Sequence, residues 1–309
     1  MTGLWPPIDA PIDVKYQILS DTYTNQSHQF AKPRKKVENG FMTKETLFIG
    51  HGSPMNALPD YAPGHAWQAA LRQMGSKSLP EKKSILAISA HWQTRGSEVF
   101  ASAEPHVIHD FIGFPNELHA FQYLAPGAVD EAEGLARGLR AAGHEVIYTA
   151  EWGYDHGVWS VLAHLAPAAN IPVFMLSLDR RKTLADHFEL ATAVGRMIAD
   201  ETLVVASGNI VHALATMEED PAARPPSWAV EFDNHIAAAI VSRDWKGLTG
   251  ISREHGTPDK LSVPTLEHYI PLVYAAGISA GRGTQTKSPE FFYEGFDHGT
   301  VSMRCVRFW

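Results

Sequence analysis

The sequence predicts an α/β fold: a single domain with a central mixed, mostly parallel sheet flanked by helices. From Leu47 onward, short apolar runs alternate with segments of helical periodicity, which is the succession expected of strands joined by crossover helices. Two strand-like runs close the chain, which indicates a mixed sheet. At 309 residues the chain can bury a large core, as one α/β domain or as two smaller ones, and nothing in the sequence forces a division.

The first two thirds of the chain carry the clearest strands and helices. The run of Leu47 stops at the turn-forming segment Gly50-His51-Gly52-Ser53-Pro54, and Pro167 stops one of the helical segments. We expect strands over residues 47–49, 84–90, 145–148, 172–178 and 203–209, and helices over residues 64–75, 127–143, 155–165 and 183–199.

The last third is less regular. Residues 228–241 have helical periodicity and residues 248–260 read as a loop. A further helix is expected to open at Pro264, because proline is favoured in the first helical turn. Strand-like runs cover residues 290–293 and 300–308, and the second run alternates as an edge or antiparallel strand would.

Residues 1–45 differ in composition from the rest of the chain. They contain Trp5-Pro6-Pro7, a polar segment at 22–27 and a basic cluster at 32–36. This composition predicts an extension without its own core, poorly structured or packed on the surface. The basic cluster can bind an acidic partner, although a solvated tail is the commoner role of such a run.

Composition and charge exclude several classes of protein. Hydrophobic residues make up 45% of the chain and charged residues 19%, as in ordinary globular enzymes and binding proteins. The formal net charge is −8 and no long basic run is present, so we expect no nucleic-acid partner. No apolar run approaches a membrane span and no secretory signal is evident, so we expect no membrane partner and a cytoplasmic location. Cys305 is the only cysteine, which excludes a multi-thiolate zinc site.

Three of the 16 histidines follow apolar runs in the same way. His51 follows the run ending in Ile49-Gly50, His91 follows Ser89-Ala90, and His212 follows Ser207-Gly208-Asn209-Ile210-Val211. If these strands are parallel neighbours, their carboxyl ends lie at one sheet edge, where ligands bind in open α/β sheets, and the three imidazoles can converge. A single such histidine is as often an ordinary loop or core residue, so the recurrence is what favours a site.

Two further histidines can reach the same edge. His268 is expected in the first turn of the helix behind Pro264-Thr265, with an ordinary surface position as the alternative. His156 lies in Trp152-Gly153-Tyr154-Asp155-His156-Gly157, a glycine-bounded turn that suits an active-site group or a plain helix N-terminus equally.

An aromatic-rich loop at residues 106–124 offers candidate substrate-binding residues. Its phenylalanines are expected to pack in the core, but together with polar neighbours they can also line a pocket for an aromatic substrate. The polar candidates are His109, Asp110 and His119.

Taken together, six motifs resemble those of the DOPA 4,5-dioxygenase type of class III extradiol ring-cleavage dioxygenases. The resemblance extends over about residues 46–308 in the right order, so it implies that residues 46–309 form an extradiol dioxygenase catalytic domain. The motifs are Gly50–Met55, Ser89–Trp92, Ile108–Pro115, Trp152–Gly157, Ala206–His212 and Pro264–Tyr269.

The resemblance implies a role for each histidine. His51, His91 and His268 are similar to the metal ligands of this family. His212 is similar to the residue that either completes a four-histidine zinc site or, in the iron form, acts as general base. His156 is similar to the histidine that contacts substrate or oxygen, so the expected catalytic residues are His212 and His156.

The identity of the metal follows less directly. Relatives of the protocatechuate 4,5-dioxygenase kind have a glutamate where His268 stands, which gives the two-histidine, one-carboxylate set of non-haem Fe(II) oxygenases. An all-imidazole site suits zinc as well as iron. We expect Fe(II) to be the catalytic cofactor and zinc to be able to occupy the site.

The reaction that the resemblance implies is the opening of a catechol ring with O2. The expected substrate is L-DOPA or a related catechol, cleaved at the 4,5 bond to a seco-DOPA or muconic semialdehyde. The choice of catechol, 4,5- against 2,3-cleavage, and a monomer against a homodimer stay open. A zinc-dependent hydrolase with the same histidines is the alternative enzyme, and a non-catalytic metal or small-molecule binder is the alternative outside catalysis.

Overall fold

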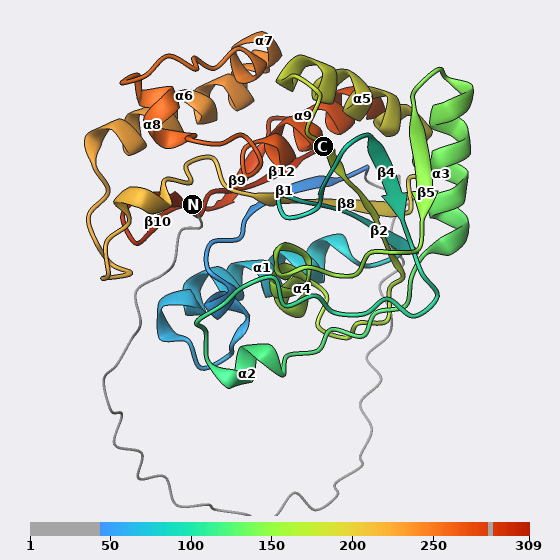
Figure 1. The fold of residues 1–309 in the computed structure, drawn as a ribbon, viewed down its shortest axis with the longest axis horizontal. Helices are drawn as coiled ribbons and strands as arrows, with labels where there is room; N and C mark the ends of the chain where they lie inside the picture. The colour runs from blue at the N-terminus through green and yellow to red at the C-terminus, as the bar shows by residue number, and fades with distance from the viewer. Residues whose placement is uncertain (1–43, 284–286) are drawn as a thin grey trace, which may run out of the picture. The chain divides into compact units, whose positions relative to one another are not determined.

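The structure is a computed structural model that describes residues 44–283 and 287–309, and an eight-stranded sheet runs through the middle of this part (Figure 1). The four central strands are mutually parallel, whereas antiparallel pairs join them to the outer strands. The predicted mixed, mostly parallel sheet is therefore confirmed. From edge to edge its strands are β5 (Val146–Thr149), β4 (Ser97–Phe100), β6 (Val173–Leu176), β2 (Ser84–Ser89), β8 (Thr202–Gly208), β1 (Thr46–Gly50), β12 (Cys305–Phe308) and β9 (Glu290–Tyr293).

The described residues all belong to one compact unit, Met42–Trp309. The prediction for residues 1–45 therefore lies almost entirely outside the described residues.

Helices cover both faces of the sheet (Figure 1). One face carries α1 (His65–Ser78) and α4 (His156–Leu165), and the other carries α5 (Leu184–Met197) and α9 (Ile270–Arg282). α3 (Val129–Ala141) packs on β4 and β5, and α6 (Ser227–Ser242) lies on the side of α5 and α9. None of these described helices is both long and apolar enough to span a membrane.

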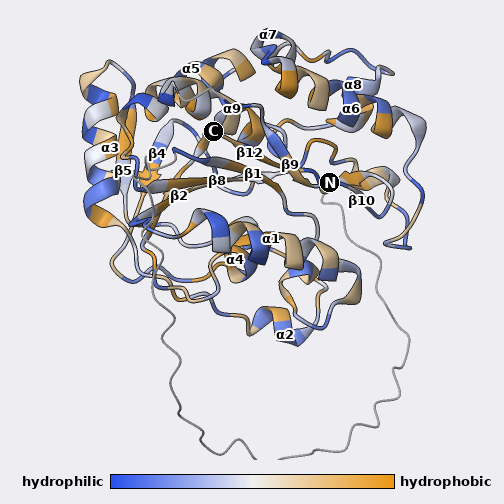
Figure 2. Cartoon of the chain, turned by 180° about the vertical axis from the view of Figure 1, so that it is seen from behind, coloured by the Kyte–Doolittle hydropathy of each residue, from blue (hydrophilic) through white to orange (hydrophobic). Residues whose placement is uncertain are grey.

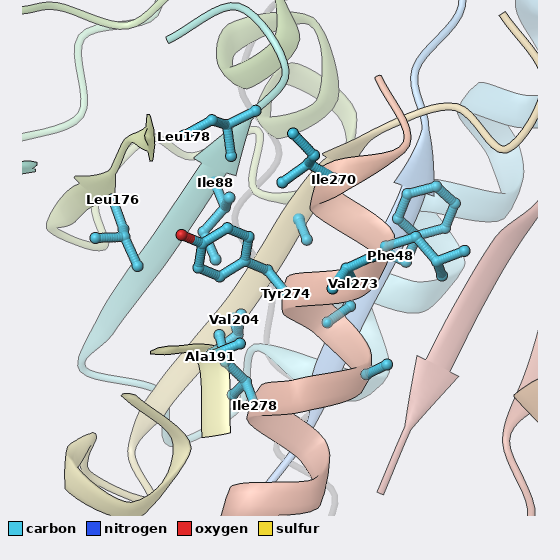
Figure 3. Packing of buried hydrophobic residues seen from close by; sticks show 14 of the residues in the cluster. Phe48, Ile88, Leu176, Leu178, Ala191, Val204, Ile270, Val273, Tyr274 and Ile278 are labelled. Atoms are coloured by element: carbon cyan, nitrogen blue, oxygen red, sulfur yellow. The ribbon is translucent and has the colours of Figure 1, made fainter. Parts of the chain in front are cut away.

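Alternation of side chains along the strands divides the core into two clusters, one on each face. In β1, Leu47 and Ile49 join the cluster below α1 and α4, whereas Phe48 joins the cluster below α5 and α9. The strands β2 and β8 consist mostly of hydrophobic residues (Figure 2). The helix α3 carries both hydrophobic and hydrophilic residues, as a surface helix does (Figure 2). In the second cluster, side chains of α9 lie over the strands: Ile270, Val273, Tyr274 and Ile278 meet Phe48, Ile88 and Val204 (Figure 3).

Short elements complete the described fold. They are β3 (Gln93–Thr94), β7 (Leu178–Asp179), β10 (Phe296–Asp297), β11 (Val301–Ser302), α2 (Asn116–His119), α7 (Trp245–Thr249), α8 (Pro258–Ser262) and 3-10 turns at Pro54–Ala57, Ala62–Gly64 and Leu214–Thr216.

Several of the described elements were not predicted from the sequence, among them the helices α7 and α8 and the strand β4. Within or beside the expected loop 248–260, α7 is capped by Asp244 and α8 by Thr257. Each has only five residues, too few to show a helical period, so their capping residues were the available signal. The additional strand, β4, begins with a serine and a glutamate, and so lacks the apolar run that marks its neighbours.

The predicted start of this helix at Pro264 is wrong, although a helix does follow. Residues 264–269 form bends and turns, and α9 begins at Ile270 with Pro271 in its first turn. The chain is held in the turn because the carbonyl of His268 accepts a hydrogen bond from the Asn209 amide at 2.8 Å. His268 is therefore in a turn before the helix and not in its first turn.

The final run, 300–308, is antiparallel, which was one of the two expected alternatives, but it is not an edge strand. It divides into β11 and β12, and β12 lies between β1 and β9. All four residues of β12 are buried, because helices and the neighbouring strands cover it.

Candidate metal centre

The three strands that end near histidines are adjacent in the sheet. β2, β8 and β1 are consecutive and parallel, so their carboxyl ends lie at one edge. The amide of His51 donates to the carbonyl of Gly208 at 3.1 Å, and the amide of Ala90 donates to that of Ser207 at 3.0 Å. These two hydrogen bonds extend the pairing of the strands past their last regular residues. They therefore hold the turns that carry the histidines at fixed distances from one another.

Three imidazoles meet at this edge. The Nε2 atoms of His51 and His91 are 3.3 Å apart. The ring of His268 is centred 5.3 Å from that of His51 and 5.0 Å from that of His91. Each of the three residues offers a nitrogen, and the three nitrogens all lie within 4.8 Å of one another.

The outer nitrogen of each imidazole has a polar partner. Nδ1 of His51 lies 3.0 Å from Oγ of Ser207, Nδ1 of His91 lies 3.1 Å from Asp110, and Nδ1 of His268 lies 3.3 Å from Glu267. A partner at Nδ1 fixes the tautomer and the orientation of a metal-binding histidine. The Nε2 atoms are therefore the nitrogens left to bind an ion.

This donor set fits a divalent metal. In a tetrahedral site with nitrogens ~2.0–2.1 Å from the ion, neighbouring nitrogens stand ~3.3–3.4 Å apart, close to the 3.3 Å between His51 and His91. Imidazole donors suit zinc, iron, copper and nickel, so the donor set by itself selects a transition metal without naming one.

His212 lies against His268 and not between the other imidazoles. The two rings are stacked, with centroids 3.4 Å apart and planes inclined by 10°. The amide of His212 donates to the Ser262 carbonyl at 2.9 Å, and an isolated bridge to Val301 holds the same residue. One ring nitrogen of His212 lies within 4.8 Å of a ligand atom of His268 and of a carboxylate oxygen of Glu267.

His156 is the first residue of α4 and is held by Asp110. Both its amide and its Nδ1 approach Oδ1 of Asp110, at 3.0 and 2.9 Å. Asp155 caps the helix, accepting from the Val158 amide, and this fixes where His156 leaves the chain. The ring of His156 is centred 3.8 Å from that of His91.

Burial keeps most of these imidazoles neutral. It lowers the pKa of His51 and His268 well below the usual value, the pKa of His156 to about 4 and that of His212 to about 3, and the neighbouring histidines add to each shift. Neutral imidazole is the form that binds metals or accepts a proton.

His91 and Asp110 behave differently because they face each other. Burial lowers the pKa of His91, but hydrogen bonding and charge attraction from Asp110 outweigh it and raise the pKa overall. Burial likewise raises the pKa of Asp110, and the hydrogen bonds from His156 and His91 reverse this and lower it. Asp110 is thus held as a carboxylate.

The three residues expected to bind substrate occupy different positions. Both oxygens of Asp110 face histidines, one His91 and the other His156. Nε2 of His109 lies 3.0 Å from the carbonyl of Phe121, and His119 is exposed with its ring 5.1 Å from that of Phe111. Besides Asp110, Phe111 of the same loop approaches the cluster, with its ring 5.9 Å from that of His156.

Three further residues at the site, Ser207, Glu267 and Asp155, were not predicted from the sequence. Glu267 and Ser207 lie inside the motifs that contain His268 and His212, so they were visible without an indicated role. The hydroxyl of Ser89 donates to Oδ1 of Asp155 at 2.6 Å and accepts from the backbone amide of His91 at 3.2 Å. The contacts of Ser207 and Asp155 are identified only once the fold brings distant segments together, whereas Glu267 is next to His268 in the sequence.

Comparison with known proteins identifies the kind of enzyme. Residues 45–303 match the family described as the catalytic LigB subunit of aromatic ring-opening dioxygenase. A protein of Escherichia coli (strain K12) named 4,5-DOPA dioxygenase extradiol is 38% identical over 268 residues, which are 84% of this chain and 93% of that protein. A protein of Beta vulgaris with the same name is 32% identical over 268 residues, 86% of this chain and 96% of its own.

A solved structure agrees with these matches. The crystal structure of an uncharacterized protein from Escherichia coli K12 aligns with a TM-score of 0.71 and 32% identity, covering 86% of this chain and 100% of that chain. Fold, histidine cluster and relatives together define an extradiol aromatic ring-opening dioxygenase. The chain belongs to the LigB family of these enzymes, which confirms the resemblance seen in its motifs.

Proposed function

We propose that the enzyme opens the ring of a catechol with O2 at a ferrous ion held by His51, His91 and His268. The observation that carries this proposal is that Nδ1 of all three imidazoles faces a polar side chain, which leaves the Nε2 atoms for the ion. The proposed substrate is L-DOPA or a close relative, cleaved at the 4,5 bond to a seco-DOPA or muconic semialdehyde. The names of the similar proteins from Escherichia coli and Beta vulgaris support this choice.

The ferrous ion, when bound, supplies Lewis acidity toward the catechol oxygens and the redox chemistry that O2 requires. Zinc fits the same imidazoles but has no redox chemistry. We therefore expect a zinc-loaded sample to be folded and inactive.

We assign removal of a catechol hydroxyl proton to His212, with His156 as the second candidate. Both rings are neutral near pH 7, because burial lowers their pKa values to about 3 and about 4, so each has a lone pair to accept a proton. In His156, Nδ1 faces Asp110, which leaves Nε2 as the accepting atom. The alternative role of His212, as a fourth metal ligand, predicts loss of metal on substitution.

The 106–124 loop is proposed to hold the aromatic ring of the substrate. Phe111 faces His156, and its ring lies 5.1 Å from that of His119 and 6.0 Å from that of His109. These aromatic and imidazole rings offer several inclined faces and edges for contact with a catechol ring. Asp110 contributes by holding His91 and His156 in place.

The direct test is anaerobic reconstitution of the full chain with Fe(II), followed by admission of O2 with L-DOPA, caffeate or protocatechuate. Oxygen uptake and a yellow product are expected with at least one of them, and a zinc-reconstituted sample serves as control. If none consumes oxygen while ferrous content is confirmed, the proposal fails. Turnover that needs zinc and no oxygen would instead support a hydrolase.

A further inference from the structure

A cavity of about 350 Å³ lies beside the turn that carries His51, and none of the clustered histidines lines it. Its volume is within the range of small-molecule sites. Its walls come from parts of the chain far apart in sequence: Asn56, Trp67, Asp220, Tyr293, Phe296 and Asp297 among them.

Two residues of the cavity wall hydrogen-bond to the backbone that carries His51. Asn56 lines the cavity, and its Nδ2 donates to the carbonyl of His51 at 3.2 Å. Trp67 also lines it, and its Nε1 donates to the carbonyl of Gly50 at 2.8 Å. A molecule in the cavity would therefore contact two residues, Asn56 and Trp67, that hydrogen-bond to the backbone on either side of His51.

Two carboxylates face this cavity, one on an exposed loop and one buried. Asp220 is exposed, whereas Asp297 is 8% exposed. Burial raises the pKa of Asp297, and His298, whose Nε2 is 3.8 Å from Oδ1 of Asp297, partly offsets this. A cation would stabilise the ionised form of Asp297 further.

The negative charge of Asp297 also reaches the tyrosines around the cavity. Burial and then Asp297 raise the pKa of Tyr61 to about 12, and burial, Cys305 and Asp297 raise that of Tyr293. Asp297 thus acts on two neutral tyrosines and lies beside His298, whose Nδ1 is 2.8 Å from the carbonyl of Glu218.

Aromatic side chains supply the remaining recognition. Trp67, Tyr293 and Phe296 line the same cavity as the two carboxylates. Aromatic faces attract ammonium groups, most strongly where water is excluded, and a carboxylate adds direct charge attraction. Carboxylates among aromatic rings therefore favour a positively charged organic group over an anion or a neutral polar molecule.

We propose that this cavity is a binding site for an organic ammonium compound, with the cationic nitrogen near Asp297 and Asp220 and its hydrocarbon part against Trp67 and Phe296. The ammonium group can belong to an aminated catechol substrate or to a separate amine. The first case rests on the proposed function, and the second does not.

Calorimetric titration of the full Fe(II)-loaded chain under anaerobic conditions tests the site without turnover. The probe is 2-phenylethylammonium, and its neutral counterpart is 2-phenylethanol. We expect the ammonium to bind at least roughly tenfold more tightly than the alcohol, and Asp297→Asn to remove this preference. The matched control is Asp130→Asn, which alters an exposed carboxylate on α3.

Equal affinity for the two probes, or an ammonium preference that survives Asp297→Asn, overturns the site. If Asp297→Asn fails to fold by circular dichroism, Asp220→Asn on the exposed loop takes its place, with a smaller loss of preference expected.

Steady-state kinetics then distinguish the two sources of the ammonium group, with dopamine compared against ethylcatechol, which lacks the amine. If the substrate supplies the ammonium, Asp297→Asn raises the KM for dopamine roughly tenfold relative to the KM for ethylcatechol, and 2-phenylethylammonium competes with dopamine. If a separate amine supplies it, the ratio of the two KM values stays as in the wild type while the calorimetric binding persists in the wild type. Failure of all turnover would count against the proposed function and leave the calorimetric result intact.

Discussion

Asp110 and His91 form an ion pair in which Oδ2 of the carboxylate lies 3.1 Å from Nδ1 of the imidazole. The other oxygen of Asp110 faces Nδ1 of His156 at 2.9 Å. One carboxylate therefore orients two imidazoles whose rings are only 3.8 Å apart, and directs the other nitrogen of each away from itself. Asp110, which the sequence suggested as a substrate-binding residue, contacts a proposed metal ligand, His91, and a proposed catalytic residue, His156.

Replacing Asp110 should weaken metal binding. In Asp110→Ala, His91 and His156 lose the acceptor that fixes their orientation, and we expect a roughly 10–100-fold lower affinity for Fe(II) and for Zn(II). Competition with a chelator of known affinity measures this. Glu117→Gln, at an exposed position of α2 near the same loop, is the control and should retain wild-type affinity. Unchanged affinity in Asp110→Ala would show that the pair does not organise the centre.

Replacing His212 separates its two proposed roles. If it is the general base, His212→Gln lowers kcat by roughly 10²–10⁴-fold while the bound iron per chain is unchanged. Parallel measurements of turnover and of iron content test this, with His235→Gln, at an exposed position of α6, as control. Loss of the iron together with the activity would contradict the base assignment and make His212 a ligand.

The sequence predicted the parallel strands and the meeting of their ends, and the reason is local. β1, β2 and β8 are apolar runs that end in turn-forming residues, so their direction and boundaries are encoded by neighbouring residues. The meeting of the three histidines also required these strands to be neighbours, and the observed order β2-β8-β1 makes them so. The roles of the individual histidines stay predictions.

The features that the sequence did not predict depend on contacts between distant segments. In the turn at residues 264–269 the carbonyl of His268 accepts from the amide of Asn209, a long-range contact that no local pattern reveals. Some partners of the imidazoles likewise come from distant segments: Ser207 reaches His51 across 156 positions of the chain. Propensity describes a segment by itself, and such long-range hydrogen bonds override it.

The metal-free protein should lose stability as the pH falls from about 6.5 to about 4. Burial lowers the pKa of His187 to about 4, so in this interval the unfolded chain binds a proton that the native chain does not. Each such histidine reduces the free energy of unfolding by up to ~1.4 kcal/mol per pH unit, and His156 and His212, whose pKa values are also lowered, act in the same direction.

Urea unfolding at several pH values measures this slope. In His187→Gln the free energy of unfolding should fall less steeply with decreasing pH, by up to ~1.4 kcal/mol per pH unit, which corresponds to one proton. In His235→Gln, which alters an exposed residue, the slope should equal that of the wild type. A slope as steep in His187→Gln as in the wild type would contradict the assignment of a buried neutral imidazole.

Two helical glycines should respond in opposite ways to alanine. A Cβ at Gly75 of α1 would stand 1.9 Å from the carbonyl oxygen of Leu165 in α4, whereas one at Gly134 of α3 would meet nothing within 4 Å. Alanine favours a helix over glycine by up to ~1 kcal/mol, so Gly134→Ala should raise the free energy of unfolding by about that amount. Gly75→Ala should lower it by ~1–3 kcal/mol, because the two helices must separate.

The Gly75 substitution should also reach the metal centre. α4 begins at His156, so a displaced α4 moves this imidazole relative to Asp110. We therefore expect Gly75→Ala to lower kcat as well as stability, and Gly134→Ala to change only stability. Urea unfolding and oxygen uptake on the same two purified variants test both statements. A Gly75→Ala protein as stable and as active as the wild type would mean that α1 and α4 are not in such close contact.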